Sequence, residues 1–247
     1  MAIQALLVIL AVLLVLLFLG VPISYAIAVS SLTAILSSID LNVAVLTAAQ
    51  RTFVGMSKFS LTAIPFFILA GNIMNQGGIA KRLVDFVMAI LGKMPGALLV
   101  TNIGTNALFG AISGSATATC SAIGGMTIPA MKKEGYSDSF AAATASMASI
   151  LGPMIPPSIT LIVYASATET SISALFQATV IPGVLLALFL VGYSLWYGKK
   201  KDLPSRPKQN AQQIFRTFRS SIWALLMPVI ILGGIFGGIF TATEAAA

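Results

Sequence analysis

Two sets of uncharged oxygens are the residues most able to do chemistry in this chain. The first lies in residues 93–132, where no side chain between the two terminal lysines is charged and Ser113, Ser115 and Thr117 surround a glycine. The second lies in the run 149–158 (SILGPMIPPS), where three prolines remove backbone donors and interrupt a helix. Hydroxyls and unpaired carbonyls suit a hard cation such as sodium, and helix N-termini suit an anion. This combination is typical of carriers.

Catalysis is poorly supported by the sequence. The chain has no His and a single Cys, Cys120, which excludes a His-based general acid or base, a zinc site of ordinary spacing and an internal disulfide. Its seven acidic residues are predicted at helix ends or in loops, so none is an obvious proton relay inside a membrane. No Gly-rich phosphate loop with a following Lys is present, which argues against ATP hydrolysis. We therefore expect no enzyme and no cofactor.

The composition is that of an integral membrane protein. Hydrophobic residues make up 57% of the 247 residues and charged residues only 9%. The formal charge of +7 arises from Lys and Arg placed between apolar runs, where cytoplasmic flanks of membrane helices carry them. We expect contact with membrane lipid and no nucleic acid.

These oxygens must be positioned by helices, which the apolar runs and breakers predict. The first run has no Lys or Arg before it, so it is interpreted as a retained membrane helix and not as a signal peptide. A mixed pattern of polar and apolar residues indicates that the third segment is an interfacial or partly buried helix, and charge on a helical period places the fifth at the membrane surface. The predicted segments are 5–19, 22–38, 42–58, 59–74, 79–91, 95–112, 116–131, 139–167 with an internal break, 171–197 and 222–240.

The segment 95–131 is predicted to be a helical hairpin, because basic residues flank both of its ends and both should face the cytoplasm. Its length does not decide between a re-entrant and a spanning hairpin. Ligand contact is favoured for residues 113–117 at its tip, whereas helix packing and ligand contact are equally open for Ser121 and Ala122. The same charge rule places the amino terminus outside and Lys199–Lys201 inside.

The predicted organisation has five parts, which differ in hydropathy and charge. They are scaffold-type helices over 1–58, connecting and surface helices over 59–94, a transport-type region over 95–198 containing the hairpin and the broken helix, a cytoplasmic linker over 199–221, and the start of a further scaffold helix over 222–247.

Four segments, in this order, resemble the large membrane subunit of tripartite ATP-independent periplasmic (TRAP) transporters. They are 63–72 (AIPFFILAGN), 122–131 (AIGGMTIPAM), 152–158 (GPMIPPS) and 240–247 (FTATEAAA). Together they extend over essentially the whole chain, and four motifs in register are more specific than one. The resemblance implies an all-α, multi-span helical bundle with a hairpin and a discontinuous helix, the first half of an inverted-repeat, elevator-type transporter.

The resemblance also implies a function. Members are sodium-coupled secondary importers of small organic acids in the bacterial inner membrane, with Na+ as coupling ion, a small membrane subunit and a periplasmic solute-binding protein. By position, Thr117 and Ser158, at the starts of half-helices, would face the substrate carboxylate. The sodium-binding residues would be Ser113, Gly114, Ser115, Ser149, Gly152 and Pro156.

The sequence departs from the family pattern in two ways. Many members have an acid near position 119, where this chain has Thr119, so direct anionic help to the cation is in doubt. A second hairpin and a second broken helix should also follow, yet the proline break occurs once. We expect the chain to be the amino-terminal half of the permease and not to transport alone.

Three other interpretations remain open. A channel could also use hydroxyls and carbonyls, but would need an oligomeric pore. A membrane enzyme would need a charged cluster at the interface, and the only close acids, Glu134 and Asp138, sit beside Lys132 and Lys133 at a helix start. The last alternative is a structural membrane fragment that does not transport.

Overall fold

The computed structural model describes residues 2–205 and 209–246, and all regular structure in these ranges is helical. This confirms the all-helical fold predicted from the sequence. The chain separates into two compact units, an N-terminal unit up to Lys58 and a C-terminal unit from Phe59 onward.

The N-terminal unit consists of three helices, α1 (Ala2–Phe18), α2 (Ile23–Leu36) and α3 (Leu41–Met56). The turn between α1 and α2 uses Gly20 with a positive φ of 77°, and the two helices pack against each other. The buried residues of α2 are small and repeat every four positions: Ala26, Ser30 and Ala34. The large apolar side chains of this unit are mostly exposed. Small residues between helices and large ones outside are the pattern of helices embedded in lipid.

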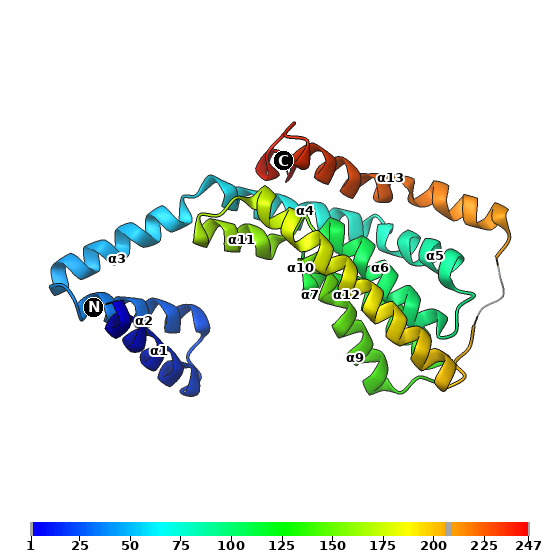
Figure 1. Ribbon diagram of the computed structural model, residues 1–247, viewed down its shortest axis with the longest axis horizontal. Helices are drawn as coiled ribbons and strands as arrows, with labels where there is room; N and C mark the ends of the chain where they lie inside the picture. The colour runs from blue at the N-terminus through cyan, green and yellow to red at the C-terminus, as the bar shows by residue number, and fades with distance from the viewer. Residues whose placement is uncertain (1, 206–208, 247) are drawn as a thin grey trace. The chain divides into compact units, whose positions relative to one another are not determined.

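The C-terminal unit contains the remaining elements, many of which are labelled in Figure 1. Two of them are not α-helical: η1 is a short 3-10 helix and η2 is a π-helix. In chain order they are η1 (Phe59–Thr62), α4 (Ala63–Gln76), α5 (Ile79–Leu91), α6 (Ala97–Ser113), α7 (Ala116–Thr119), η2 (Cys120–Gly124), α8 (Gly125–Lys133), α9 (Asp138–Ser149), α10 (Leu151–Met154), α11 (Ile159–Thr168), α12 (Ile172–Lys200), α13 (Ala211–Phe236) and α14 (Ala242–Ala246).

Helix α6 is the centre of the C-terminal unit. All but three of its 17 residues are buried, and α5, α9, α10 and α12 pack around it (Figure 1). Helix α5 is amphipathic and buries Ala80, Leu83 and Val87, whereas its charged residues lie on the other face. It packs between α6 and α13. The first arm of the predicted hairpin is therefore enclosed by protein.

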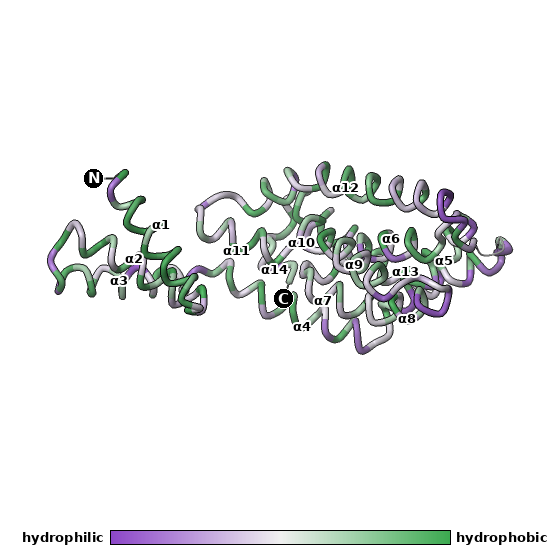
Figure 2. Tube along the Cα trace, turned by 90° about the horizontal axis from the view of Figure 1, so that it is seen from below, coloured by the Kyte–Doolittle hydropathy of each residue, from purple (hydrophilic) through white to green (hydrophobic). Residues whose placement is uncertain are grey.

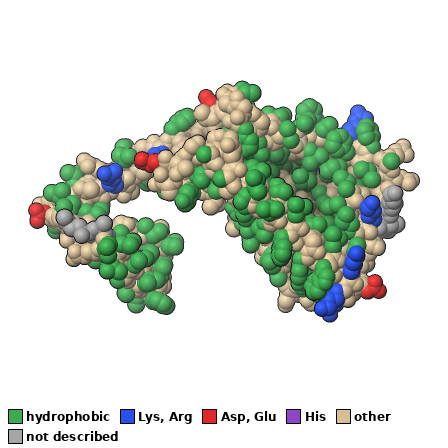
Figure 3. Space-filling model, in the orientation of Figure 1, with side chains coloured by type: hydrophobic (Ala, Val, Ile, Leu, Met, Phe, Trp, Pro, Cys, Tyr) green, Lys and Arg blue, Asp and Glu red, His purple; other side chains and the backbone are tan. Residues whose placement is uncertain are grey.

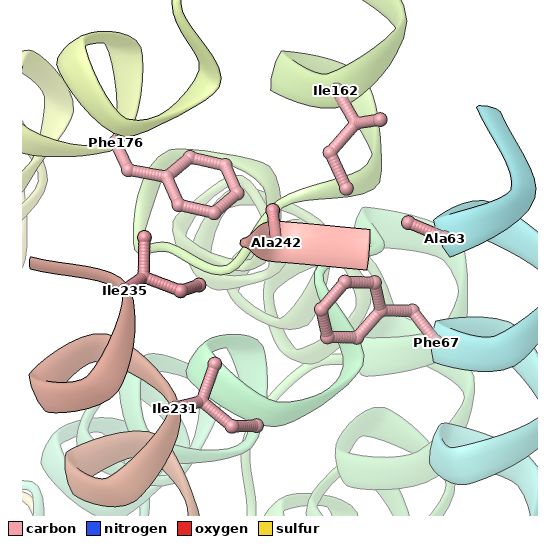
Figure 4. Close-up of a cluster of buried hydrophobic side chains, with 7 residues drawn as sticks. All are labelled: Ala63, Phe67, Ile162, Phe176, Ile231, Ile235 and Ala242. Atoms are coloured by element: carbon pink, nitrogen blue, oxygen red, sulfur yellow. The ribbon is translucent and has the colours of Figure 1, made fainter. Parts of the chain in front are cut away.

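A hydrophobic cluster holds α4 beside α11 and the end of α13. Figure 4 shows its side chains converging from α4, α11, α12, α13 and α14. Close packing of these side chains holds the helices together, so the cluster fixes the helix that follows the proline break. Its members are Ala63, Phe67, Ile162, Phe176, Ile231, Ile235 and Ala242.

Several helices have the length and hydropathy of membrane spans. Among the described residues, α12 and α13 qualify individually, and α9–α10 with α11 qualify together across a bend of 49°. Figure 2 shows the hydrophobic middle turns of α12 and its hydrophilic C-terminal end. These features agree with a multi-pass membrane protein.

Most helix boundaries lie within a few residues of the prediction, and three larger differences stand out. The last long helix begins at Ala211, not at residue 222, because the backbone N–H of Asn210 donates to Gln213 Oε1 at 3.2 Å and starts the helix early. The irregular part of the predicted linker 199–221 is correspondingly shorter. The segment 59–74 is divided, with α4 starting at Ala63 so that Pro65 falls in its first turn. The second arm of the hairpin contains the π-helix η2.

Candidate functional site

The hairpin tip and the proline break contact each other directly. The tip is the turn around Gly114 between α6 and α7, and the break is the non-helical stretch before α11. The backbone N–H of Ile159 donates to the carbonyl of Gly114 at 3.2 Å. Gly114 has a φ of +60°, and a Cβ at this position would lie 2.7 Å from the carbonyl oxygen of Pro157. Only glycine meets both requirements, so the tip is shaped to fit the break.

A second glycine contact joins α6 to α10. A Cβ on Gly110 would lie 2.7 Å from the Cα of Gly152, and a Cβ on Gly152 would lie 2.9 Å from Thr119 Oγ1. These backbones therefore approach more closely than any side chain would allow, as in small-residue packing of membrane helices. The two interrupted helices are held together on both sides of the tip.

Three neutral oxygens are gathered inside this contact. Thr119 Oγ1 donates to the carbonyl of Ser115 at 2.6 Å and lies 2.9 Å from Ser113 Oγ. Because the single Thr119 proton is already given to Ser115, the Ser113 hydroxyl donates to Thr119 and keeps its own lone pairs available. We call Ser113 Oγ, Thr119 Oγ1 and the Ser115 carbonyl the oxygen cluster. Neutral oxygens close together are suitable ligands for a hard cation.

Serines cap the two helices that start at this site. Ser115 and Ser158 both have extended backbone, and their Oγ atoms accept from Ala118 N at 3.4 Å and from Leu161 N at 3.3 Å. Each cap satisfies one of the free N–H groups in the first helical turn and leaves others available. The start of the helical stretch 116–133 and the start of α11 thus lie at the same site.

A cavity of about 390 Å³ lies beside the tip. Three elements line it: α4, the hairpin tip and the first residue of α11. Its volume is within the usual range for small-molecule sites. A larger cavity of about 630 Å³ lies between η1 and α14 and is lined by none of the predicted site residues. The lining of the smaller cavity is Phe67, Ile68, Gly71, Asn72, Ser113, Ser115, Thr117, Ala118 and Ile159.

Buried polar groups continue from the tip along α6. Asn102 and Asn106 are each at most 1% exposed, and the side-chain amide of Asn106 donates to the carbonyl of Asn102 at 2.7 Å. Within the described residues, Asn102 Nδ2 and Thr105 Oγ1 have no protein partner. Such groups are costly against lipid, which explains why α6 is surrounded by protein.

The structure brings together some of the predicted site residues. Ser113, Gly114, Ser115 and Gly152 meet where the hairpin tip contacts α10 and the break. Ser149 is buried, but its hydroxyl donates to Ser146 O of its own helix at 2.7 Å. Pro156 is also buried, and its peptide bond to Pro157 is cis.

The two predicted substrate residues have different environments. Thr117 is exposed and lines the cavity, whereas Ser158 is 0% exposed and does not line it. Sequence reasoning missed Gly110 and Asn72, although Asn72 ends one of the family-like segments. It mentioned Thr119 only as a departure from the family, and the structure places its hydroxyl in the oxygen cluster.

Comparison with known proteins identifies the family. Residues 10–247 match the model of the family described as tripartite ATP-independent periplasmic transporter, DctM component. The chain belongs to this family. The resemblance to the TRAP large membrane subunit, first seen in four segments, is confirmed over nearly the whole sequence.

Curated relatives agree with this assignment. The uncharacterized protein YgiK of Salmonella typhimurium is 48% identical over 92% of this chain and 53% of its own length. The C4-dicarboxylate TRAP transporter large permease protein DctM of Pseudomonas aeruginosa is 43% identical over 88% of this chain and 50% of its own length. The isethionate TRAP transporter permease protein DctMQ of Oleidesulfovibrio alaskensis is 42% identical over 92% of this chain and 36% of its own length.

Two conclusions follow from these relatives. The chain spans about half the length of YgiK and DctM and about a third of DctMQ. The two relatives with a functional name are transporter permeases and not enzymes, which confirms the expectation that this TRAP permease chain is not an enzyme.

Proposed function

We propose that this chain is the permease component of a sodium-coupled importer of small organic acids, working with a small membrane subunit and a periplasmic solute-binding protein in the bacterial inner membrane. One observation carries the proposal: two interrupted helices meet at a cluster of neutral oxygens beside a cavity of about 390 Å³. The relatives named for isethionate and C4-dicarboxylates support an organic anion as the substrate.

The cation is proposed to bind at the oxygen cluster. Sodium would be coordinated by Ser113 Oγ, Thr119 Oγ1 and the Ser115 carbonyl, completed by backbone oxygens near Gly114 and Gly152. The three named oxygens belong to the hairpin, and Gly152 of the broken helix packs directly against them, so ion binding would favour the contact between the two. Since Thr119 is uncharged, the site adds no negative charge of its own.

The substrate is proposed to bind in the adjacent cavity. Its carboxylate would lie near the helix start at Ala116, where free N–H groups and the helix dipole contribute about 0.3–1 kcal/mol, and up to about 2 kcal/mol when partly buried. Thr117 and Asn72 supply hydrogen-bonding side chains in this cavity. Ser158 would act indirectly, by capping the second helix start.

Coupling between ion and substrate follows from Ser115. Its carbonyl belongs to the oxygen cluster, and the residue also lines the cavity. A cation on the carbonyl fixes the tip, and the fixed tip presents its helix start to the carboxylate. We further propose that this region moves as the transport part of an elevator, as the first half of an inverted repeat, against scaffold-type helices.

Uptake measurements test the proposal. Proteoliposomes would contain the chain, either alone or with the segment that completes the relatives' length and the partner proteins, and uptake of labelled C4-dicarboxylates and isethionate would be measured in sodium and in choline. We expect sodium-dependent uptake only by the complete assembly. Equal uptake in choline would refute sodium coupling, and single-channel current without a binding protein would favour a channel.

Two variants divide the proposed site into its parts. Thr117→Val should weaken substrate binding about fivefold, the effect of one hydrogen bond of about 1 kcal/mol, and leave sodium binding unchanged. Ser113→Ala should weaken sodium binding. Thr52→Val is the matched control, because its hydroxyl only donates to Ala48 O within α3. An unchanged substrate affinity in Thr117→Val would remove the cavity from the proposal.

A further inference from the structure

A second, separate groove lies on the C-terminal unit between α6, α9 and α12. Its volume is about 120 Å³ and its lining is mostly apolar. The residues of α9 that line the groove lie at helical spacing from Phe140 to Ala148, so the groove extends about 12 Å along that helix. The lining residues are Leu99, Ile103, Phe140, Ala143, Thr144, Met147, Ala148, Leu190, Tyr193 and Ser194.

The groove is open toward an exposed apolar surface. Met147 is 56% exposed and Tyr193 is 48% exposed. In α12, only 17% of the most apolar 18-residue window is buried. Such an exposed apolar span presents a surface suited to acyl chains, and the groove is a recess in that surface.

An aromatic stack closes one end of the groove. The ring centroids of Phe140 and Tyr197 are 4.7 Å apart, and those of Tyr193 and Trp196 are 5.8 Å apart. Tyr193, Trp196 and Tyr197 lie on one face of α12 at positions i, i+3 and i+4. Tyr and Trp gather at the level of lipid headgroups, where one part of the ring is apolar and the other is wet. This end of the groove is therefore at the membrane interface.

Positive charge follows directly beyond the aromatic stack. Lys200 Nζ lies 4.9 Å from the centroid of the Trp196 ring, and Lys199 and Lys201 flank it in the sequence. On the neighbouring α9, Asp138 is paired with Lys132 at 2.9 Å, so this acid is already neutralised. Figure 3 shows Lys and Arg side chains at this end of the unit beside a hydrophobic surface.

We propose that the groove binds an anionic phospholipid, with one acyl chain in the recess and the phosphate at Lys199, Lys200 and Lys201. The order along α12 is apolar groove, aromatic ring and basic side chain, which is also the order of groups in such a lipid. The groove offers few polar groups to an organic acid, and its apolar lining gives water few partners. Charge complementarity selects an anionic headgroup over a zwitterionic one.

The volume of the groove indicates how much of the lipid's acyl chain it can hold. A cavity of 150 Å³ accommodates benzene, so 120 Å³ accommodates roughly four methylene groups. The acyl chain already lies in hydrocarbon before it binds, so the groove contributes shape and little hydrophobic free energy. The headgroup carries the preference, and each lysine near the surface contributes about fivefold.

Fluorescence quenching of Trp196 tests this site. The chain has two tryptophans, and Trp223→Phe leaves Trp196 as the only reporter. The protein is placed in phosphatidylcholine vesicles with brominated acyl chains carried either on phosphatidylglycerol or on phosphatidylcholine. We expect brominated phosphatidylglycerol to quench Trp196 at a fraction of the lipid on the order of 100-fold lower, from about fivefold for each of the three lysines.

Two variants, each with a matched control, locate the effect. Lys200→Gln with Lys201→Gln should weaken the phosphatidylglycerol preference about 25-fold, whereas Lys81→Gln with Arg82→Gln on α5 should not. Ala143→Phe, which fills the groove from an exposed position, should weaken binding because the acyl chain no longer fits there. Val184→Phe, at an exposed position of α12 outside the groove, should not.

Three results would overturn the proposal. One is equal quenching by the two brominated lipids. Another is a preference for phosphatidylglycerol that changes neither in the Lys200→Gln, Lys201→Gln double variant nor in Ala143→Phe. The third is loss of the preference when partner subunits are added, which would show that protein and not lipid fills the groove. If Ala143→Phe lowers the circular dichroism signal of folded protein, Thr144→Leu serves as the second groove-filling variant.

Discussion

Replacing Gly110 by alanine should damage the proposed ion site while leaving the fold largely intact. The new Cβ would lie 2.7 Å from Gly152 Cα and 3.0 Å from Gly152 N. Both are backbone atoms, so ordinary contact at 3.4 Å requires α10 to move by 3.4 − 2.7, or about 0.7 Å. The overpacking costs about 1–3 kcal/mol, and the better helix propensity of alanine offsets about 1 kcal/mol of this.

The effect on the ion site should be larger than the effect on stability. Binding constellations tolerate errors of only about 0.5 Å, and Gly152 packs against Thr119 of the oxygen cluster. We expect sodium affinity to fall at least tenfold. The assay is thermal unfolding of the purified chain in detergent, in sodium chloride and in choline chloride.

The expected shifts can be stated in advance. Sodium at ten times its Kd stabilises the native protein by about 1.4 kcal/mol, which raises Tm by about 3–6 °C for a chain of this size. With a tenfold weaker site the stabilisation falls to about 0.4 kcal/mol, or about 1 °C. The shift should therefore nearly disappear in Gly110→Ala.

Gly192→Ala is the matched control. Gly192 is also helical, but a Cβ there meets nothing within 4 Å, so alanine should stabilise α12 by up to about 1 kcal/mol and leave the sodium shift intact. The reasoning is refuted if Gly110→Ala keeps the full shift, or if both variants lose it equally.

Three further predictions concern the site and its surroundings. Thr119→Val keeps the shape of the side chain but removes a cluster oxygen, so the sodium shift in Tm should fall by at least half; an unchanged shift would exclude this hydroxyl as a ligand. Pro156→Ala with Pro157→Ala should let the helix re-form and abolish sodium-driven uptake by the complete transporter, and normal uptake would show that the prolines only kink the helix. Burial raises the pKa of Tyr136 from 10.0 to about 12, with Glu134 acting in the same direction. Because the pKa is higher in the folded state, the contribution of Tyr136 to the free energy of unfolding is complete below pH 10 and is lost as the pH rises toward 12. Stability measured against pH should show this loss, and Tyr136→Phe should lack it without a cost at neutral pH, since the hydroxyl has no described partner.

Local patterns in the sequence were sufficient for most of the helices. The amphipathic period of residues 79–91 predicts α5 with the bounds observed, Ile79–Leu91. The Ser-Gly-Ser turn and the three prolines predict the two interruptions, because glycine and proline act on the backbone at their own positions. The family was also identified at this level, from four segments in register.

Departures from regular α-helix geometry, and the exact start of a helix, could not be predicted from such local patterns. The 3-10 helix before α4 and the π-helix η2 have compositions that an ordinary α-helix also accepts. The start of α13 depends on one cap at Asn210 within a polar stretch that also fits a linker. Hydropathy marks where a membrane span ends, but a helix can continue into water.

Contacts between distant segments were the least predictable. Gly110 and Gly152 are 42 positions apart in the sequence, and their spacing does not indicate that they meet. The same holds for Asn72, which reaches the cavity only because the cluster around Phe67 places α4 beside α11. Such contacts depend on how helices pack, and packing is not visible in the period of a single helix.

The neutrality of the site connects its chemistry to its position in a membrane. None of the side chains in the oxygen cluster or lining the cavity is charged, so the loaded site would carry only the charge of its ion and its substrate. Moving a net charge through a bilayer is costly, and a cation bound beside a carboxylate removes that cost. An acid at position 119 would add one negative charge that a further cation must balance. In the proposed mechanism, Thr119 therefore makes the charge of the substrate, and not that of the protein, the quantity that sodium would have to neutralise.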